Sequence, residues 1–386
     1  MSFAIQALPE PLREIVEQVK LFAPDESNID DLRTAWKEHV SRAKQHVPGV
    51  CVESDGEVLY LGELSPGCRA CKQGTWDCIF VTMACNLNCE FCYSPQAVSR
   101  DYAGSVFGTG PEQIAKNYAK THITGVSFSG GEPFADPSKL LQWAAWFACR
   151  YPENHYWVYT NGLLADEDST RRLGELGVDE IRFNLAATGY NHPTVLKNLA
   201  SSARFIPNVT VEIPAIPEHA SQLLSSLADW CSLGVKFLNL HELMYEPGTN
   251  AASMSGPRWD IITADGHHTQ VNPESRALTL ATMIHVQNKA LALSVNDCSL
   301  QSKLCQLRGR RRSLAPLTKN PNEDLVAGAF LESYCLYRNA QDFLFCHPAA
   351  VPEMRALYPD YKLVKIVREA PLSLEGDSRW IAIEEC

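Results

Sequence analysis

A loop with three closely spaced cysteines places the strongest constraint on how this chain of 386 residues can fold. Cys85, Cys89 and Cys92 follow one another with the spacing C-x3-C-x2-C. Three thiolates can bind three irons of a cubane cluster. No neighbouring Cys or His in the sequence supplies a fourth ligand, so one iron would stay open to a ligand from outside the protein. The alternatives are a zinc site, which usually needs four protein ligands, and a surface group of thiols.

Short apolar segments alternate with helical patterns on the C-terminal side of this loop. The apolar run that leads into the loop predicts a buried strand whose carboxyl end carries the cysteines, where parallel α/β sheets bind ligands. Six β–α units of this spacing predict a parallel sheet with right-handed crossovers. The predicted strands are Cys78–Ala84, Gly125–Ser129, His155–Thr160, Glu180–Ala186, Val209–Ile213 and Val235–Leu240, and the helices between them include Pro111–Lys120, Pro137–Arg150, Ser169–Leu176 and His219–Leu233.

The second predicted strand ends in a glycine-rich turn, Gly130-Gly131-Glu132-Pro133. Two glycines let the backbone approach a ligand closely, because they carry no Cβ atom. Their carbonyl groups and the Glu132 carboxylate can accept hydrogen bonds from an ammonium group. A type II β-turn without a ligand is the alternative for such a glycine pair.

The cysteine loop and the glycine-rich turn together resemble the signature of the radical S-adenosylmethionine (SAM) superfamily, with Phe91 at the aromatic place of the loop. The resemblance implies an α/β fold: a partial, TIM-like (β/α)6 barrel that is open on one side. It implies a [4Fe–4S] cluster bound by Cys85, Cys89 and Cys92, with SAM chelating the open iron. The protein would then orient SAM and substrate while the reduced cluster cleaves SAM to a 5′-deoxyadenosyl radical, which abstracts hydrogen from the substrate.

The resemblance also assigns residues at the strand ends to SAM. Gly130, Gly131 and Glu132 would hold the amino group of SAM. The resemblance also implies an electron donor, such as flavodoxin or ferredoxin, that reduces the cluster. Asn239 and His241, on the sixth strand, either face the cavity and meet the substrate or form a structural hydrogen-bonded pair. The remaining predicted SAM contacts are Phe91, Thr160, Asn161, Asn184 and Ile216.

Composition and charge exclude several other classes. The formal net charge of −11 argues against broad nucleic-acid binding, which needs a basic surface. No apolar stretch is long enough for a membrane span and the N-terminal residues do not form a signal-peptide pattern, so we expect a cytoplasmic protein without a membrane partner. The 14 cysteines then indicate metal or redox chemistry, because disulfides are disfavoured in that compartment.

The chain is expected to have three parts. The first, 1–66, carries two amphipathic helices and a hairpin that turns at Asp55-Gly56. The partial barrel occupies 67–297, and a cysteine-containing α+β extension occupies 298–386. In the flanks we predict helices at Pro9–Ala23, Asn28–His46, Arg276–Ala290 and Glu323–Tyr337, and strands at Leu291–Val295, Lys362–Val367 and Trp380–Glu384.

Cysteines outside the loop suggest an auxiliary iron–sulfur cluster. Cys68 and Cys71 precede the first barrel strand, whereas Cys298 and Cys305 follow the last, and the two ends of a barrel sheet approach each other in space. Buried free thiols or a zinc site are the alternatives. Substitute ligands would be Cys78, Cys335 and Cys346.

The radical chemistry leaves several substrates open. We expect an enzyme that acts on a peptide side chain or on a small natural-product metabolite. The alternatives are an activase for a glycyl-radical enzyme, a radical SAM methyltransferase and a non-enzymatic metal-binding protein. Candidate catalytic residues that would quench a substrate radical are Tyr334, Cys335 and Tyr337.

Overall fold

The computed structural model describes residues 8–21, 26–92, 110–247, 249–262, 268–376 and 378–386. The chain forms two compact units. The barrel unit comprises residues 31–261 and 269–306, and the terminal unit comprises residues 1–30, 262–268 and 307–386. Within the described ranges, no helix is long and apolar enough to cross a membrane.

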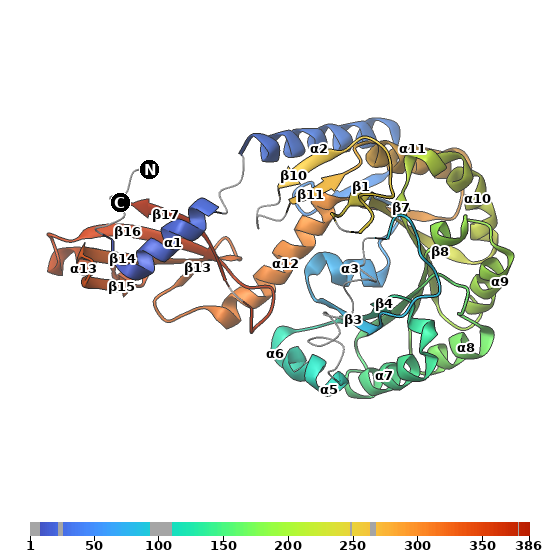
Figure 1. The fold of residues 1–386 in the computed structure, drawn as a ribbon, viewed down its shortest axis with the longest axis horizontal. Coiled ribbons are helices and arrows are strands. Elements are labelled where there is room, and N and C mark those ends of the chain that lie inside the picture. Colours follow the sequence, from blue (N-terminus) through green and yellow to red (C-terminus); the bar gives the residue numbers. More distant parts are fainter. Residues whose placement is uncertain (1–7, 22–25, 93–109, 248, 263–267, 377) are drawn as a thin grey trace. The chain divides into compact units, whose positions relative to one another are not determined.

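A nine-stranded sheet forms the centre of the barrel unit (Figure 1). Its strand order is β1-β2-β12-β8-β7-β6-β5-β4-β3. Strands β3 to β8 are parallel, β12 adds a seventh parallel strand beside β8, and β2 pairs with β12 antiparallel. The predicted partial barrel is therefore confirmed. The strands are β1 Val50–Glu53, β2 Val58–Leu61, β3 Trp76–Thr82, β4 Gly125–Gly130, β5 His155–Thr160, β6 Glu180–Phe183, β7 Asn208–Ala215, β8 Val235–Glu242 and β12 Ser294–Cys298.

Helices cover the outer face of this sheet, and most begin soon after a strand ends (Figure 1). Helix α3 does not cover this outer face. Its residues Gly67 and Ala70 instead pack against residues at the start of β4, β5 and β6. The α-helices are α2 Glu26–His46, α3 Pro66–Gln73, α5 Pro111–Ile114, α6 Tyr118–Thr121, α7 Pro137–Arg150, α8 Glu167–Glu175, α9 Pro193–Ser202, α10 Ala220–Ser232, α11 Glu274–Asn288 and α12 Leu300–Thr318, which continues into the terminal unit. The 3₁₀ helices are η2 Ala115–Asn117, η3 Pro133–Ala135, η4 Leu185–Thr188 and η5 Pro217–His219.

A second, three-stranded sheet consists of β9 Met244–Tyr245, β10 Trp259–Ile262 and β11 His268–Val271.

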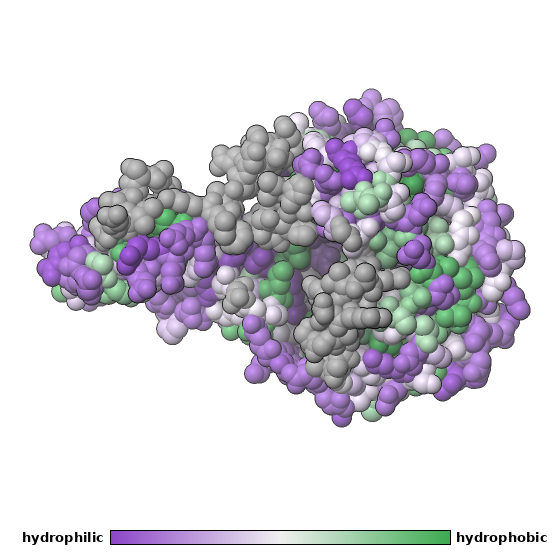
Figure 2. Space-filling model, in the orientation of Figure 1, coloured by the Kyte–Doolittle hydropathy of each residue, from purple (hydrophilic) through white to green (hydrophobic). Residues whose placement is uncertain are grey.

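Alternation along the strands sorts side chains between two layers. Val126, Val158, Ile181, Val211 and Leu238 are buried in the core beneath the helices. The residues between them point to the other face, which is polar. In Figure 2, purple hydrophilic residues follow the outer rim of this unit, and green residues gather closer to its centre.

The predicted N-terminal helix and hairpin contribute to the barrel unit from residue 31 onward. β2 extends the sheet by pairing with β12, with Leu61 opposite Val295. His39 of α2 is hydrogen-bonded to Asp297 of β12 at 2.8 Å, and both side chains are buried. Helix α2 and the hairpin therefore stabilise the edge of the sheet that follows β8.

The terminal unit is an antiparallel sheet covered by α1 on one face. Leu8, Leu12 and Ile15 pack on Cys335 and Val364. The helix predicted over residues 323–337 is wrong, because this segment forms a hairpin whose turn holds residues 327 and 328 at positive φ. The elements are α1 Glu10–Leu21, β13 Asp324–Val326, β14 Phe330–Asn339, β15 Asp342–Cys346, η6 Pro348–Ala350, α13 Val351–Leu357, β16 Lys362–Glu369 and β17 Arg379–Glu385.

Candidate active site at the strand ends

The cysteine loop leaves the carboxyl end of β3 as predicted. Cys85, Cys89 and Cys92 are all partly exposed, and the Cys92 N–H donates to the Cys89 carbonyl at 3.0 Å. Burial raises the pKa of Cys85 and of Cys89, the latter to about 11, and the negative charges of the neighbouring thiolates add to both shifts. The three thiols are thus close enough to interact, although no three His, Cys, Asp or Glu side chains form a ready metal site in the described part of the chain.

The glycine-rich turn packs directly against the entrance to this loop. Gly131 N–H donates to the Thr82 carbonyl at 2.8 Å, and Glu132 N–H donates to the Ala84 carbonyl at 2.8 Å. A Cβ atom at Gly131 would lie 2.5 Å from the carbonyl oxygens of both Met83 and Ala84. Only glycine permits this approach, so the turn fixes where the cysteine loop begins.

Glu132 organises the next strand end. Its buried carboxylate accepts hydrogen bonds from Asn161 N–H at 2.7 Å, Thr160 Oγ1 at 2.9 Å and Phe134 N–H at 3.1 Å. Burial raises its pKa, and the three donors oppose that shift. Both oxygens already have partners within the protein. The role predicted for this side chain, holding the SAM amine, remains a prediction.

Asn161 connects the end of β5 to the cysteine loop. Its amide donates to Asn86 Oδ1 at 2.7 Å, and its Nδ2 lies 4.0 Å from Cys85 Sγ. Asn184 N–H donates to the Thr160 carbonyl at 2.8 Å, which places the two strand ends side by side. The structure therefore brings Asn161 next to the loop and places Thr160 and Asn184 at the adjoining strand ends.

Phe91 and Ile216, the two apolar residues predicted to contact SAM, belong to one packed cluster with Leu243 and Tyr245. Their positions form an apolar wall beside the cysteine loop. Their predicted contact with SAM remains a prediction.

Two residues that hold the loop were not predicted. Asn250 donates to the Phe91 carbonyl at 3.0 Å, and Ser253 donates to the Glu90 carbonyl at 2.8 Å. Both lie in the Gly-, Asn- and Ser-rich connection after β9. Such a composition indicates a turn but does not identify its partner.

The inner face of the barrel unit contains a network of buried ions. Arg182 donates to Glu180 Oε1 at 2.8 Å and to Glu212 Oε2 at 2.6 Å. His241 lies 2.7 Å from Glu212 Oε1, and Asn239 donates to Glu212 Oε2 at 2.9 Å. Burial alone would raise the pKa of both carboxyls, but the charge of Arg182 and the hydrogen bonds and charges of the neighbouring histidines together outweigh burial and lower both pKa values.

The predicted auxiliary ligands lie near this network without converging. Cys68 donates to Asn239 Oδ1 at 3.4 Å, and Arg182 donates to its sulfur at 3.6 Å. Cys71 interacts electrostatically with Cys68 and Cys298, and Cys305 is buried in the same apolar cluster as Cys68. No three of these thiols form a metal-binding group within the described ranges. The auxiliary cluster therefore remains a prediction.

The three candidate catalytic residues lie on β14 of the terminal unit. Cys335 and Tyr337 are buried in its apolar core under α1, and Tyr334 packs on the opposite side beside Leu344 and Tyr358. Packing accounts for all three side chains, and their predicted catalytic role remains a prediction.

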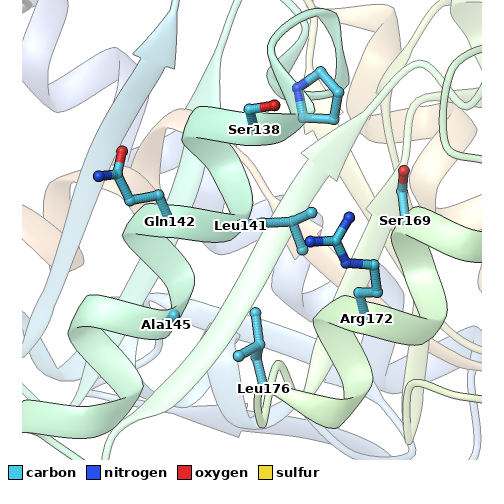
Figure 3. A pocket seen from close by; sticks show the side chains of 8 residues that line it. Ser138, Leu141, Gln142, Ala145, Ser169, Arg172 and Leu176 are labelled. Atoms are coloured by element: carbon cyan, nitrogen blue, oxygen red, sulfur yellow. The ribbon is translucent and has the colours of Figure 1, made fainter.

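A groove on the outside of the barrel unit lies away from the cysteine loop. It runs between α7 and α8, with Leu141 and Leu176 at its floor and Arg172 at its side (Figure 3). No residue predicted to bind the cluster or SAM lines it. The groove is a gap between two neighbouring helices.

Comparison with known proteins agrees with this geometry. Residues 66–177 match the family model described as a 4Fe-4S single cluster domain, a range that includes the cysteine loop and the glycine-rich turn. MJ0021 of Methanocaldococcus jannaschii, named as a candidate glycyl-radical enzyme activating enzyme, is 28% identical over 294 residues, which are 72% of this chain and 76% of that protein. The family resemblance predicted from the two motifs is confirmed.

Solved structures with a similar fold share little sequence with this chain. Streptococcus suis SuiB bound to S-adenosylmethionine is 14% identical with a TM-score of 0.43, over 67% of this chain and 53% of that one. Native anSMEcpe with bound AdoMet is 16% identical with a TM-score of 0.33, over 43% of this chain and 50% of that one. The chain spans about half the length of both proteins.

Proposed function

We infer that this radical SAM enzyme, which uses a 4Fe–4S cluster and SAM, abstracts a hydrogen atom from a peptide or protein substrate. One observation carries the assignment of the site: the two backbone hydrogen bonds that hold the glycine-rich turn against the cysteine loop. Cys85, Cys89 and Cys92 are the proposed cluster ligands. When bound and reduced, the cluster supplies the electron that cleaves SAM to methionine and the 5′-deoxyadenosyl radical.

The chain's own residues would orient SAM beside these thiols. Glu132 fixes Thr160 and Asn161, and the Asn161 amide donates to Asn86 of the loop from this fixed strand end. Gly131 leaves its backbone open to an ammonium group, since it has no side chain. Phe91 and Ile216 supply an apolar surface that excludes water from one side.

A glycyl-radical enzyme is the substrate that one observation favours. The relative that shares 28% identity over most of both chains is named for activating such an enzyme. A different peptide, a small natural-product metabolite and methyl transfer are the competing proposals. Flavodoxin or ferredoxin is the electron donor that we propose.

The first experiment uses anaerobically reconstituted protein with dithionite and SAM. We expect about four irons per chain and release of 5′-deoxyadenosine, with both lost in the triple variant Cys85→Ala, Cys89→Ala, Cys92→Ala. Retention of the iron in that variant would contradict the ligand assignment.

EPR spectra after addition of a purified glycyl-radical enzyme then test the substrate. A glycyl radical formed with one 5′-deoxyadenosine each supports activation, and cleavage without any radical on the partner opposes it.

A further inference from the structure

The backbone between the second and third cysteines of the loop is held from outside the loop. Two carbonyls there, those of Glu90 and Phe91, accept hydrogen bonds from Ser253 at 2.8 Å and from Asn250 at 3.0 Å. A peptide group is planar, so a hydrogen bond to its carbonyl also restricts the direction of its N–H. The N–H in the plane of the Phe91 carbonyl is that of Cys92, which donates to the carbonyl of the second cysteine at 3.0 Å. Asn250 therefore fixes the peptide group that leads directly into the third cysteine.

Hydrogen bonds hold the side chain of Asn250 at both its nitrogen and its oxygen, and the residue is only 1% exposed. Besides the Phe91 carbonyl, its amide nitrogen donates to the Met244 carbonyl at 2.8 Å. Its oxygen accepts from the Glu246 N–H at 2.8 Å. An asparagine side chain supplies the two donors and the acceptor that this position needs, whereas an ionised aspartate of the same shape has no donor. The position therefore requires asparagine for chemical reasons and not for its shape.

The connection between β9 and β10 that carries both donors, residues 249–258, has further contacts of its own. Arg258 donates to the Met254 carbonyl at 2.9 Å and lies over the Tyr245 ring, 4.6 Å from its centre. The Tyr245 hydroxyl also donates to a carbonyl of the connection at 3.2 Å. The side chain of Met254 packs on the same apolar cluster as that of Phe91. The two donors are thus presented to the loop from a segment that is itself fixed in the barrel unit.

We propose, on the basis of the cluster ligands in the proposed function, that Asn250 and Ser253 are positioning residues for the cluster. Acting through the backbone carbonyls of the loop, they set the orientation in which Cys89 and Cys92 meet the irons. The glycine-rich turn fixes the start of the loop and these two donors fix its end, so the fold sets the spacing of the three ligands before any metal binds. Residues that orient metal ligands without touching the metal typically contribute about 10–100-fold to metal affinity.

Release of iron to a chelator measures this effect without reference to enzyme activity. With the anaerobically reconstituted full chain and bathophenanthroline disulfonate, we expect Asn250→Asp to release iron about 10–100 times faster than the native protein. The cluster that remains bound should give an altered EPR spectrum after reduction by dithionite, because its ligands are displaced. Asn208→Asp is the matched control, because Asn208 also donates to a backbone carbonyl, that of Asp179, but does so at the start of β7. The control should release iron at the native rate and keep the native spectrum.

Ser253→Ala decides the question even if Asn250→Asp does not fold, because Ser253 is exposed and its truncation leaves no buried cavity. We expect iron release about threefold faster than in the native protein, as for the loss of one exposed hydrogen bond. Native rates of iron release in the folded variants would overturn the proposal. So would a loss of thermal stability with an unchanged EPR spectrum, since the role would then be structural only. Failure of the proposed function has a different signature: the native protein would bind no cluster, or the triple cysteine variant would keep its iron.

Discussion

Arg182 lies between two carboxylates on the inner face of the barrel unit, so its removal would leave both without their cation. Burying an ion costs several kcal/mol unless it is paired. We therefore expect Arg182→Met to lower the free energy of unfolding by about 3–5 kcal/mol in urea denaturation. Arg171→Met is the matched control, because Arg171 pairs with Asp168 and Glu175 on an exposed helix surface and should cost less than about 1 kcal/mol. Equal losses in the two variants would contradict the structural role of Arg182.

Glu132 offers a second test at the scale of one residue. Its carboxylate accepts three hydrogen bonds, and a Gln side chain would offer one acceptor and direct an NH2 group at donors. We expect Glu132→Gln to reduce the free energy of unfolding by about 2 kcal/mol and to reduce the iron bound on reconstitution. Unchanged iron content together with full stability would show that the carboxylate does not organise the strand ends.

At the scale of elements, the contact between the glycine-rich turn and the cysteine loop can be broken by one methyl group. In Gly131→Ala, the new Cβ would meet two carbonyl oxygens of the loop, so we expect the loop to shift and iron content to fall by more than half. Gly189→Ala is the control, because a Cβ there meets no atom within 4 Å and adds only backbone strain at φ +75°. Iron per chain and thermal unfolding are the two measurements.

Elements with a strong local pattern were predicted well. His155–Thr160 and Pro137–Arg150 have the bounds of β5 and α7. The segment 323–337 was predicted wrongly, because Ala327 and Gly328 adopt positive φ values and form the turn of a hairpin, which interrupts any helix there. The ion network around Arg182 could not be predicted in full, because Glu180 and Arg182 lie on β6 whereas Glu212 lies on β7, and no spacing in the sequence indicates which residues of two strands will pair.

For the whole molecule, three buried acids with lowered pKa values make stability depend on pH. Burial would raise the pKa of Glu180, Glu212 and Asp297, yet Arg182 and the His39 hydrogen bond lower it. A lowered pKa contributes stability above the unfolded value of about 4, and that stability is lost as the pH falls below it. We expect Tm to fall steeply between about pH 5 and 3, and less steeply in Arg182→Met. A Tm that stays constant down to pH 3 would contradict this account.

The terminal unit is assembled from both ends of the chain, and this has a consequence for biosynthesis. The α1 helix leaves the ribosome early, but the strands on which Leu8, Leu12 and Ile15 pack are made only after the whole barrel unit. At about 5–20 residues per second, the nascent helix waits roughly 15–60 seconds for its partner. The barrel unit can fold during that interval, whereas the apolar face of α1 stays open to chaperones until β14, β16 and β17 have been made.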